Sequence, residues 1–258
     1  MRLFSDYIND FLRGDATALQ QELGQILLET QAGFSVSAGG NPVGFFDDFV
    51  SRYNWLGDRA TKDRYSIAQN LARNLPGAMM QDWLINLICS LLRPYPTLNI
   101  FTEVKVRFGF YPLWNAGEVA LHSPSERSDL CVGYLVDANN LSQVYPPEGE
   151  WPRTAVSRLP AGTAVIPLIT INSKIRVSQS EFFDWQGRET LMTKGNPNCL
   201  SLQVALRKEM DSDIVEAAQA YERWFLIGNG TETNVVPDHE ELQRLIHVVG
   251  EHLRERMT

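Results

Sequence analysis

The spacing of apolar residues predicts helices over about the first ninety residues of the chain and strands after them. Apolar residues recur at helical spacing in four segments, which are 3–11, 19–27, 61–71 and 78–92. A run of glycine, asparagine and proline at 39–42 interrupts this pattern and predicts a loop. We therefore expect residues 1–96 to form a helical N-terminal region that packs on the rest of the chain.

Three later segments have the patterns of β-strands. In 99–110 apolar and charged residues alternate, as in a strand with one buried face. Residues 129–136 are mostly apolar, and they follow a polar segment that we expect to be a loop. Residues 163–177 begin as a continuous apolar run, which is typical of a central strand covered on both faces. From Thr170 onward, one face of this strand becomes polar.

A helix is predicted directly after the third strand. Residues 178–181 have the S-x-x-E pattern of a capping box, and a helix is expected over 182–193. We expect the chain from there to Glu222 to be helical as well. A short strand at 224–227 and a final helix from Asp238 complete the prediction.

This order of elements predicts an α/β fold in which a mixed β-sheet is flanked by helices. Residues 97–258 would form the core with its C-terminal helices, and residues 1–96 the helical region packed on it. The chain has 258 residues, which is enough for one large domain, and we expect one structural domain in all.

Composition limits the class of protein. Hydrophobic residues make up 44% of the chain and charged residues 21%, which is ordinary for a globular protein. The longest apolar stretch, 83–92, is about half as long as the roughly 20 residues of a membrane span, so we expect no membrane partner. Asp6 interrupts any signal-peptide pattern, and Cys89, Cys131 and Cys199 are widely separated. These features predict a cytoplasmic protein without structural zinc.

The charge of the chain is unevenly distributed. A formal net charge of −8 by itself argues against a nucleic-acid partner. Residues 151–208, however, carry eight basic and three acidic side chains, a net charge of +5. Such a segment is often only a solvated face, but it is also suited to an anionic ligand.

Candidate chemistry centres on one lysine and three acids. Lys174 lies near the end of the third predicted strand, where an ammonium group needs an anionic partner unless the strand end is exposed. Glu189 falls on the apolar stripe of the following helix, and Asp129 begins the second predicted strand. Two carboxylates and a lysine at a sheet edge suit Mg²⁺-dependent hydrolysis of a phosphodiester. Glu103 and Lys105 form an E-x-K that is a rival for the same chemistry.

The residues around Lys174 resemble a known family. Residues 170–176, 178–181 and 187–189 resemble type II restriction endonucleases of the PD-(D/E)xK superfamily. The stretch 166–211 is similar to the small group typified by BbvCI, and the resemblance covers roughly residues 50–240. Asn172 stands where the superfamily has the glutamate before the lysine. In some members that acid lies on the next helix, and Glu189 comes 15 residues after Lys174.

The resemblance implies a role for each candidate residue. Asp129 and Glu189 would hold Mg²⁺, with Glu103 in a supporting place, and Lys174 would orient the attacking water. Contacts with duplex DNA are implied for six residues, which are Arg176, Ser178, Gln179, Ser180, Arg188 and Lys194. The basic segment 151–208 would then face the phosphates of DNA.

The first hypothesis is therefore a Mg²⁺-dependent, sequence-specific endonuclease of a restriction-modification system. Because both DNA strands must be cut, we expect a homodimer or a heterodimer with a related subunit. A catalytically silent DNA-binding subunit or scaffold of the same fold is an alternative, which Asn172 supports. A nuclease for repair or for branched DNA is a third.

Overall fold

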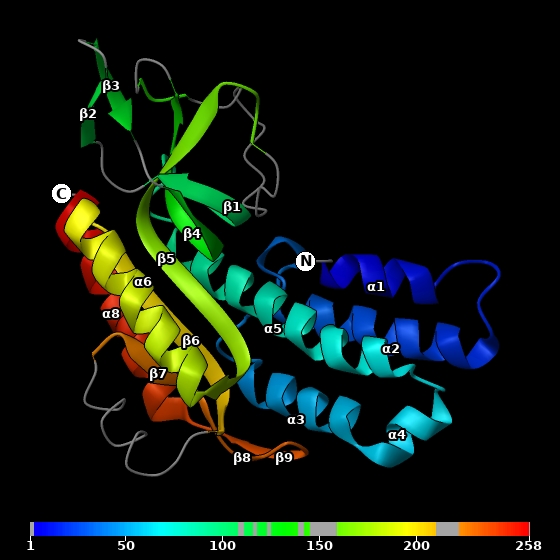
Figure 1. Ribbon diagram of the computed structural model, residues 1–258. Helices are drawn as coiled ribbons and strands as arrows, with labels where there is room; N and C mark the ends of the chain where they lie inside the picture. The colour runs from blue at the N-terminus through cyan, green and yellow to red at the C-terminus, as the bar shows by residue number, and fades with distance from the viewer. Residues whose placement is uncertain are drawn as a thin grey trace.

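The computed structural model describes residues 3–107, 111–115, 118–122, 125–138, 142–144, 159–209 and 222–257. Its N-terminal region is helical, as predicted (Figure 1). The helices of this region and one short 3₁₀ turn are α1 (Phe4–Phe11), α2 (Ala18–Phe34), η1 (Val36–Ala38), α3 (Phe46–Gly57), α4 (Arg59–Arg64) and α5 (Gln69–Leu91). The expected helix over 61–71 is wrong in part, because a turn with Ser66 at φ 49° separates α4 from α5.

The predicted mixed sheet is confirmed. Its strands are β1 (Asn99–Arg107), β4 (Ser125–Asp137), β5 (Thr163–Ser178), β6 (Leu200–Glu209) and β7 (Trp224–Leu226), in that spatial order. The pairs β1–β4 and β4–β5 are antiparallel, whereas β5–β6 and β6–β7 are parallel. Two hairpins stand apart from this sheet, β2 (Tyr111–Asn115) with β3 (Glu118–His122) and β8 (Gly228–Thr231) with β9 (Asn234–Pro237).

Helix α6 (Gln179–Gly195) connects the parallel strands β5 and β6. The predicted capping box is present, because Ser178 Oγ accepts a hydrogen bond from the Glu181 amide and Glu181 Oε2 accepts one from the Ser178 amide at 2.9 Å. The final helix, α8 (His239–Met257), begins one residue after its predicted start.

The helical prediction for the chain after residue 197 is wrong for β6. In this strand Leu200, Leu202, Val204 and Leu206 are buried in the main core cluster, and the residues between them belong to the opposite face. This is the period-two alternation of a strand. The polar loop expected before Asp129 is also partly strand, since β4 begins at Ser125. Part of the predicted helical stretch, residues 210–221, lies outside the described residues.

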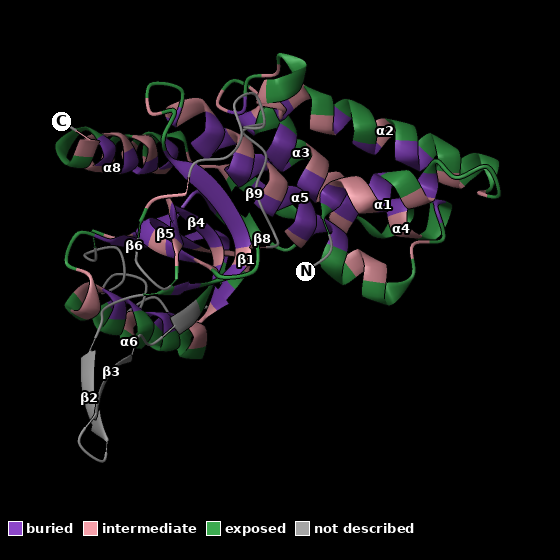
Figure 2. Cartoon of the chain, turned by 90° about the horizontal axis from the view of Figure 1, so that it is seen from above, coloured by how far each residue is buried: buried purple, intermediate pink, exposed green. Residues whose placement is uncertain are grey.

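Helices cover both faces of the sheet. On one face, a single cluster of buried side chains joins the N-terminal helices, α8 and the inner faces of β4, β5 and β6. Trp83 of α5 lies at its centre, stacked against Phe46 and Phe49. On the other face, Phe182 and Trp185 of α6 pack near Trp224. Figure 2 shows the central strands mostly buried and the outer faces of the helices exposed.

None of the described helices is long and apolar enough to span a membrane.

Candidate functional site

Asp129 lies on β4 in the interior of the sheet, next to the segment of β5 that carries Lys174. Leu130 pairs with Ile171 across the two strands, which places Asp129 opposite the segment 172–174. One carboxylate oxygen, Asp129 Oδ2, accepts a hydrogen bond from the Ser173 amide at 3.0 Å. From the other side, Gln81 of α5 donates a hydrogen bond to the Asp129 carbonyl at 3.1 Å. The helical region therefore helps to hold this part of β4.

The surroundings of Asp129 do not fully compensate its negative charge. Burial raises the pKa of its carboxyl, and the nearby Glu103 raises it further. The positive charges of Lys174 and Arg127 and the Ser173 amide act in the opposite direction, but the net pKa shift is upward. A carboxylate in this state gains from any further cation that reaches it.

Asp129 and Lys174 line one cavity of about 280 Å³. The lining residues are Arg127, Ser128, Asp129, Thr170, Asn172, Lys174, Glu181, Asp184, Trp185, Arg188, Met192 and Ser201. These residues belong to β4, β5, β6 and α6. Three strands of the sheet and the helix that connects β5 to β6 therefore contribute to the cavity. Acidic and basic side chains face the same space, as a site for a metal ion and a phosphate group requires.

Glu103 lies across from Asp129 on the neighbouring strand. The pairs Thr102–Leu130 and Val104–Ser128 flank it, so Glu103 is at the position opposite Asp129. Its φ of 56° is in the left-handed region, which is unusual for a non-glycine residue inside a strand. Such backbone strain costs about 1 kcal/mol or more and clusters at functional sites. Glu103 forms an ion pair with Arg127 at 2.5 Å.

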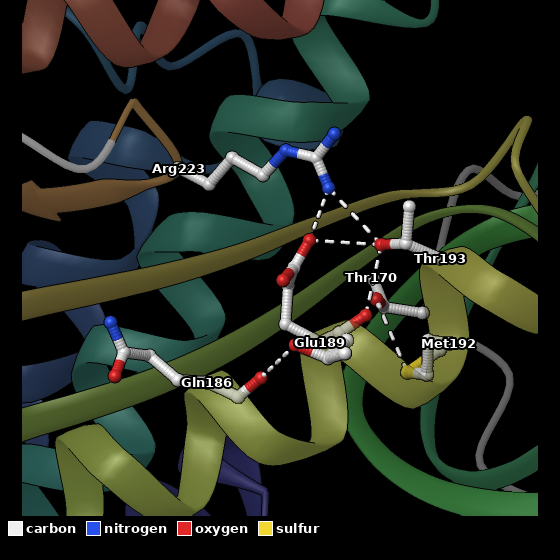
Figure 3. A network of polar contacts seen from close by, with 7 residues as sticks. Thr170, Gln186, Glu189, Met192, Thr193 and Arg223 are labelled. Atoms are coloured by element: carbon white, nitrogen blue, oxygen red, sulfur yellow. Dashed lines mark hydrogen bonds and ion pairs between the residues drawn. The ribbon is translucent and has the colours of Figure 1, made fainter.

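Glu189 is buried, as the apolar stripe of its helix predicted, but the structure does not bring it to Asp129 and Lys174. It forms an ion pair with Arg223 and accepts a hydrogen bond from Thr193 at 2.8 Å (Figure 3). It is not among the lining residues of the 280 Å³ cavity. The expected convergence of Glu189 with Lys174 is therefore absent from this structure, and its role as a metal ligand stays a prediction.

The six residues expected to contact DNA lie at several places along β5 and α6. Arg188 lines the cavity of Asp129 and Lys174, whereas Arg176 lines a second cavity. Ser178 caps α6, and Gln179 and Ser180 follow it on the exposed first turn. Lys194 is in the last turn of the same helix. At about 1.5 Å per residue, the two ends of α6 are more than 20 Å apart, so these residues would contact different parts of a duplex.

Three charged residues of the site were not assigned to it from the sequence. Asp184 and Arg127 received no role, and Glu181 was interpreted as a capping residue only. Glu181 in fact has both positions, because it caps α6 and lines the cavity. Glu181 and Asp184 are three residues apart on the first turns of the helix that follows Lys174. This spacing is the sequence pattern that could have identified both acids.

The donor set fits a hard divalent cation. Among the described residues, no three His, Cys, Asp or Glu side chains converge to hold a metal ion by themselves. Mg²⁺ commonly takes only one or two carboxylates from a protein, and water and substrate phosphates complete its shell. Asp129 and Glu103 supply carboxylates on neighbouring strands, so they match this need.

Comparisons with known proteins add little to this description. No protein-family model matches the chain, and no curated protein matches it. Among solved structures, the chain is similar to a chain of the native BbvCI A2B2 tetramer at low resolution, with a TM-score of 0.42 and 9% identity. The match covers 96% of this chain and 95% of that chain. At this identity and TM-score the likeness assigns no activity, so the function has to be argued from the site itself.

Proposed function

We propose that the protein is a Mg²⁺-dependent endonuclease that hydrolyses phosphodiester bonds in double-stranded DNA at specific sequences. The observation that carries this proposal is the meeting of Asp129 and Lys174 in one cavity, although 44 residues lie between them in the chain. A partly compensated carboxylate beside an ammonium group is what phosphodiester hydrolysis with a divalent metal needs. The sequence resemblance of residues 166–211 to restriction endonucleases supports the same class.

Asp129 is the residue we expect to hold the metal ion, because its buried carboxylate still lacks full compensation. A bound Mg²⁺ would supply charge stabilisation for the phosphate and favour ionisation of the attacking water. The Ser173 amide fixes one carboxylate oxygen of Asp129 and so orients the group toward the cavity.

Lys174 supports the reaction as a fixed positive charge. Its ammonium group lines the cavity together with Arg127 and Arg188. Lys174 would hold the attacking water by a hydrogen bond, and the two guanidinium groups suit the phosphate oxygens on which charge develops. Replacing Lys174 should therefore affect the rate of cleavage more than the binding of DNA.

Glu103 is the acid we propose as the second carboxylate. It lies opposite Asp129 on β1, and its strained backbone marks a position that the fold stabilises for a purpose other than strand formation. Arg127 would need to share Glu103 with the metal ion. Neither Glu103 nor Glu189 is among the lining residues of the 280 Å³ cavity, and both are ion-paired. Glu103 is the stronger candidate because it lies opposite Asp129 and its pair is more exposed, whereas Glu189 would have to leave Arg223 and Thr193 in a buried place.

A cut in both strands requires two active sites. We propose that the chain acts as a homodimer or as a heterodimer with a related subunit, each supplying one site. The BbvCI assembly is itself an A2B2 tetramer, which is a property of that protein.

The direct test is to incubate the purified protein with phage DNA and Mg²⁺ and to sequence the ends of any fragments. We expect discrete fragments with one common end sequence, no cleavage in excess EDTA, and binding without cleavage when Ca²⁺ replaces Mg²⁺. Asp129→Asn is the matched control, because it keeps the size of the side chain and removes its charge. Cleavage in EDTA, or by Asp129→Asn at the wild-type rate, would rule out this mechanism.

Asn172 favours one second candidate, a DNA-binding subunit without activity of its own. Asn172 lines the cavity at the position where the superfamily has an acid, so this site has one negative charge fewer. A silent subunit would bind duplex DNA with a sequence preference and would not cleave it with Mg²⁺ or Mn²⁺. Titration with both ions separates the two functions.

A further inference from the structure

A second cavity, of about 750 Å³, lies between the N-terminal helices and the sheet. It is lined by residues of α3, α4, α5, the ends of β5 and β6, and the turn between β8 and β9. Four of these lining residues are basic, Lys62, Arg73, Arg176 and Arg207, whereas Glu232 is the one acid among the described residues that line it. This balance makes the cavity strongly positive within an acidic chain.

We propose that this cavity binds a backbone phosphate of the DNA close to the one that is cut, and that the helical N-terminal region supplies half of the site. This proposal rests on the proposed function, because that function makes DNA the molecule that carries the phosphate. It also gives a more definite role to Arg176, which the family resemblance implied as a DNA contact and which the structure groups with three other cations.

The arrangement of Arg176 and Arg207 is the first argument. The two residues pair directly in the parallel register of β5 and β6, so their backbones are about 4.8 Å apart. Like charges at paired positions are destabilising, and the cost is larger when one of them is buried. Arg207 is only 6% exposed. An anion between two guanidinium groups removes this cost, and their planar forks match phosphate oxygens.

The helices provide the second argument. Lys62 of α4 and Arg73 of α5 face the same cavity, and within the described residues neither forms an ion pair. Tyr53 of α3 also lines it and lies against Arg207, where its hydroxyl adds a neutral hydrogen-bonding group. Lys62 and Arg73 come from the helical layer and Arg176 and Arg207 from the sheet, so basic side chains from two layers of the fold converge on one cavity, as a site for an anionic ligand requires.

The position along β5 identifies the ligand as a neighbour of the reacting phosphate. Lys174 lines the first cavity and Arg176 the second, and two residues of strand span about 7 Å. Phosphates of one DNA strand advance by about 3.4 Å along the helix axis for each nucleotide. A DNA strand whose scissile bond lies at Lys174 would therefore place a nearby phosphate of the same strand at Arg176.

The test measures binding of a labelled duplex by fluorescence anisotropy in Ca²⁺, over a range of salt concentrations. Lys62→Gln and Arg73→Gln are the variants, since Lys62 is half-buried and Arg73 is exposed, whereas Arg207 is too buried to replace safely. Arg59→Gln is the matched control: it removes the same charge from α4, where the Arg59 side chain is 94% exposed and outside the cavity.

We expect each cavity variant to weaken binding about tenfold, equally for a specific and a random duplex, and to reduce the salt slope by about one. Arg59→Gln should bind as wild type. Unchanged binding of both cavity variants would overturn the proposal, and so would a loss confined to the specific duplex, because that would indicate base contacts.

Two further measurements separate this proposal from the proposed function. Wild-type protein that binds duplex through Lys62 and Arg73 but never cleaves it would refute the nuclease and keep the phosphate site. If the wild-type protein cleaves the duplex and both variants bind it as tightly as wild type, the phosphate site is refuted and the nuclease is kept. If wild-type protein binds no duplex, a rise in Tm with inorganic phosphate that both variants lose would support a phosphate site with a free ligand. No response to either probe would overturn the site.

Discussion

Asp129 and Glu189 are both acids inside the fold, yet their surroundings differ. Glu189 is matched by Arg223, which supplies the opposite charge, and by Thr193, which donates a hydrogen bond to its carboxylate. The same buried region raises the pKa of the nearby Cys199 thiol to about 12, mainly by burial, so an unmatched charge would be costly there. Asp129 has one amide hydrogen bond and partial compensation from Lys174, and its pKa remains raised.

The difference separates an acid that stabilises the fold from an acid that is available to a ligand. A buried, matched ion pair such as Glu189 with Arg223 has little to gain from a metal ion, because binding one would first break the pair away from water. A carboxylate whose charge is only partly compensated gains directly from a cation. Burial alone therefore does not distinguish the two acids, whereas the degree to which their charge is compensated does, and it favours Asp129 as the acid that we propose for the metal ion.

The largest expected effect is on cleavage. Asp129→Asn should lower the rate by about 10³-fold, which corresponds to the loss of several kcal/mol of metal-dependent stabilisation. Glu189→Gln should stay within about tenfold of wild type once both proteins are folded at the assay temperature. Single-turnover cleavage with saturating Mg²⁺ measures both. If Glu189→Gln abolishes cleavage while stability and DNA binding are kept, Glu189 is the metal ligand that the sequence suggested.

Glu103→Gln should have the next largest effect, a loss of about 10²-fold in cleavage, because it removes the second carboxylate but leaves Asp129 in place. Raising the Mg²⁺ concentration should recover part of the rate, since the variant binds the ion more weakly. Lys105→Gln, two residues along the same strand and exposed, is the control and should cleave as wild type. A wild-type rate for Glu103→Gln would remove Glu103 from the site.

Glu189 should matter for the stability of the fold, in contrast to its small expected effect on cleavage. Glu189→Ala should lower the free energy of unfolding by about 2 kcal/mol, because it leaves the Arg223 charge without its partner. The double variant with Arg223→Ala should lose less than the sum of the two single losses, by about 1 kcal/mol. Urea unfolding of the four proteins gives this coupling. Strictly additive losses would show that the ion pair contributes nothing.

Metal binding should stabilise the protein through Asp129 and not through Glu189. At a Mg²⁺ concentration ten times its Kd, the free energy of unfolding should rise by about 1.4 kcal/mol, and Tm by a few degrees. Glu189→Gln should show the same shift and Asp129→Asn none. A thermal-shift titration without DNA tests this, and a shift that survives Asp129→Asn would place the ion elsewhere.

The smallest effect concerns pH. Because the pKa of Asp129 is raised by folding, its contribution favours the folded state below the ordinary pKa of about 3.8 and is lost as pH rises through the folded-state value. Without metal, Asp129→Asn should therefore be slightly more stable than wild type at pH 7. The advantage should shrink as pH is lowered through the folded-state pKa. Tm measured against pH in EDTA checks the sign, and an advantage that grows toward acid pH would contradict it.

The periodicity of apolar residues and the capping motif in the sequence predicted much of the architecture. The alternation in 99–110, the apolar run before Thr170 and the capping box at 178–181 are local patterns, and the structure has β1, β5 and α6 at these places. The prediction failed at β6, where short alternating segments of leucine and polar residues are compatible with more than one period. Residue 189 was correctly placed on the buried face of its helix, since that face follows from spacing alone.

The partners of the charged residues were decided only by the tertiary structure. Arg223 lies 34 residues after Glu189 and neutralises it, and no local pattern announces a pair at that separation. In the same way, Lys62 and Arg73 reach the cavity of Arg176 from helices, although each precedes Arg176 in the chain by more than a hundred residues. The sequence determines which side chains are buried, because burial follows from periodicity. Which charge then meets which depends on the packing of distant elements, and in this protein that packing pairs Glu189 with Arg223 and leaves the charge of Asp129 only partly compensated.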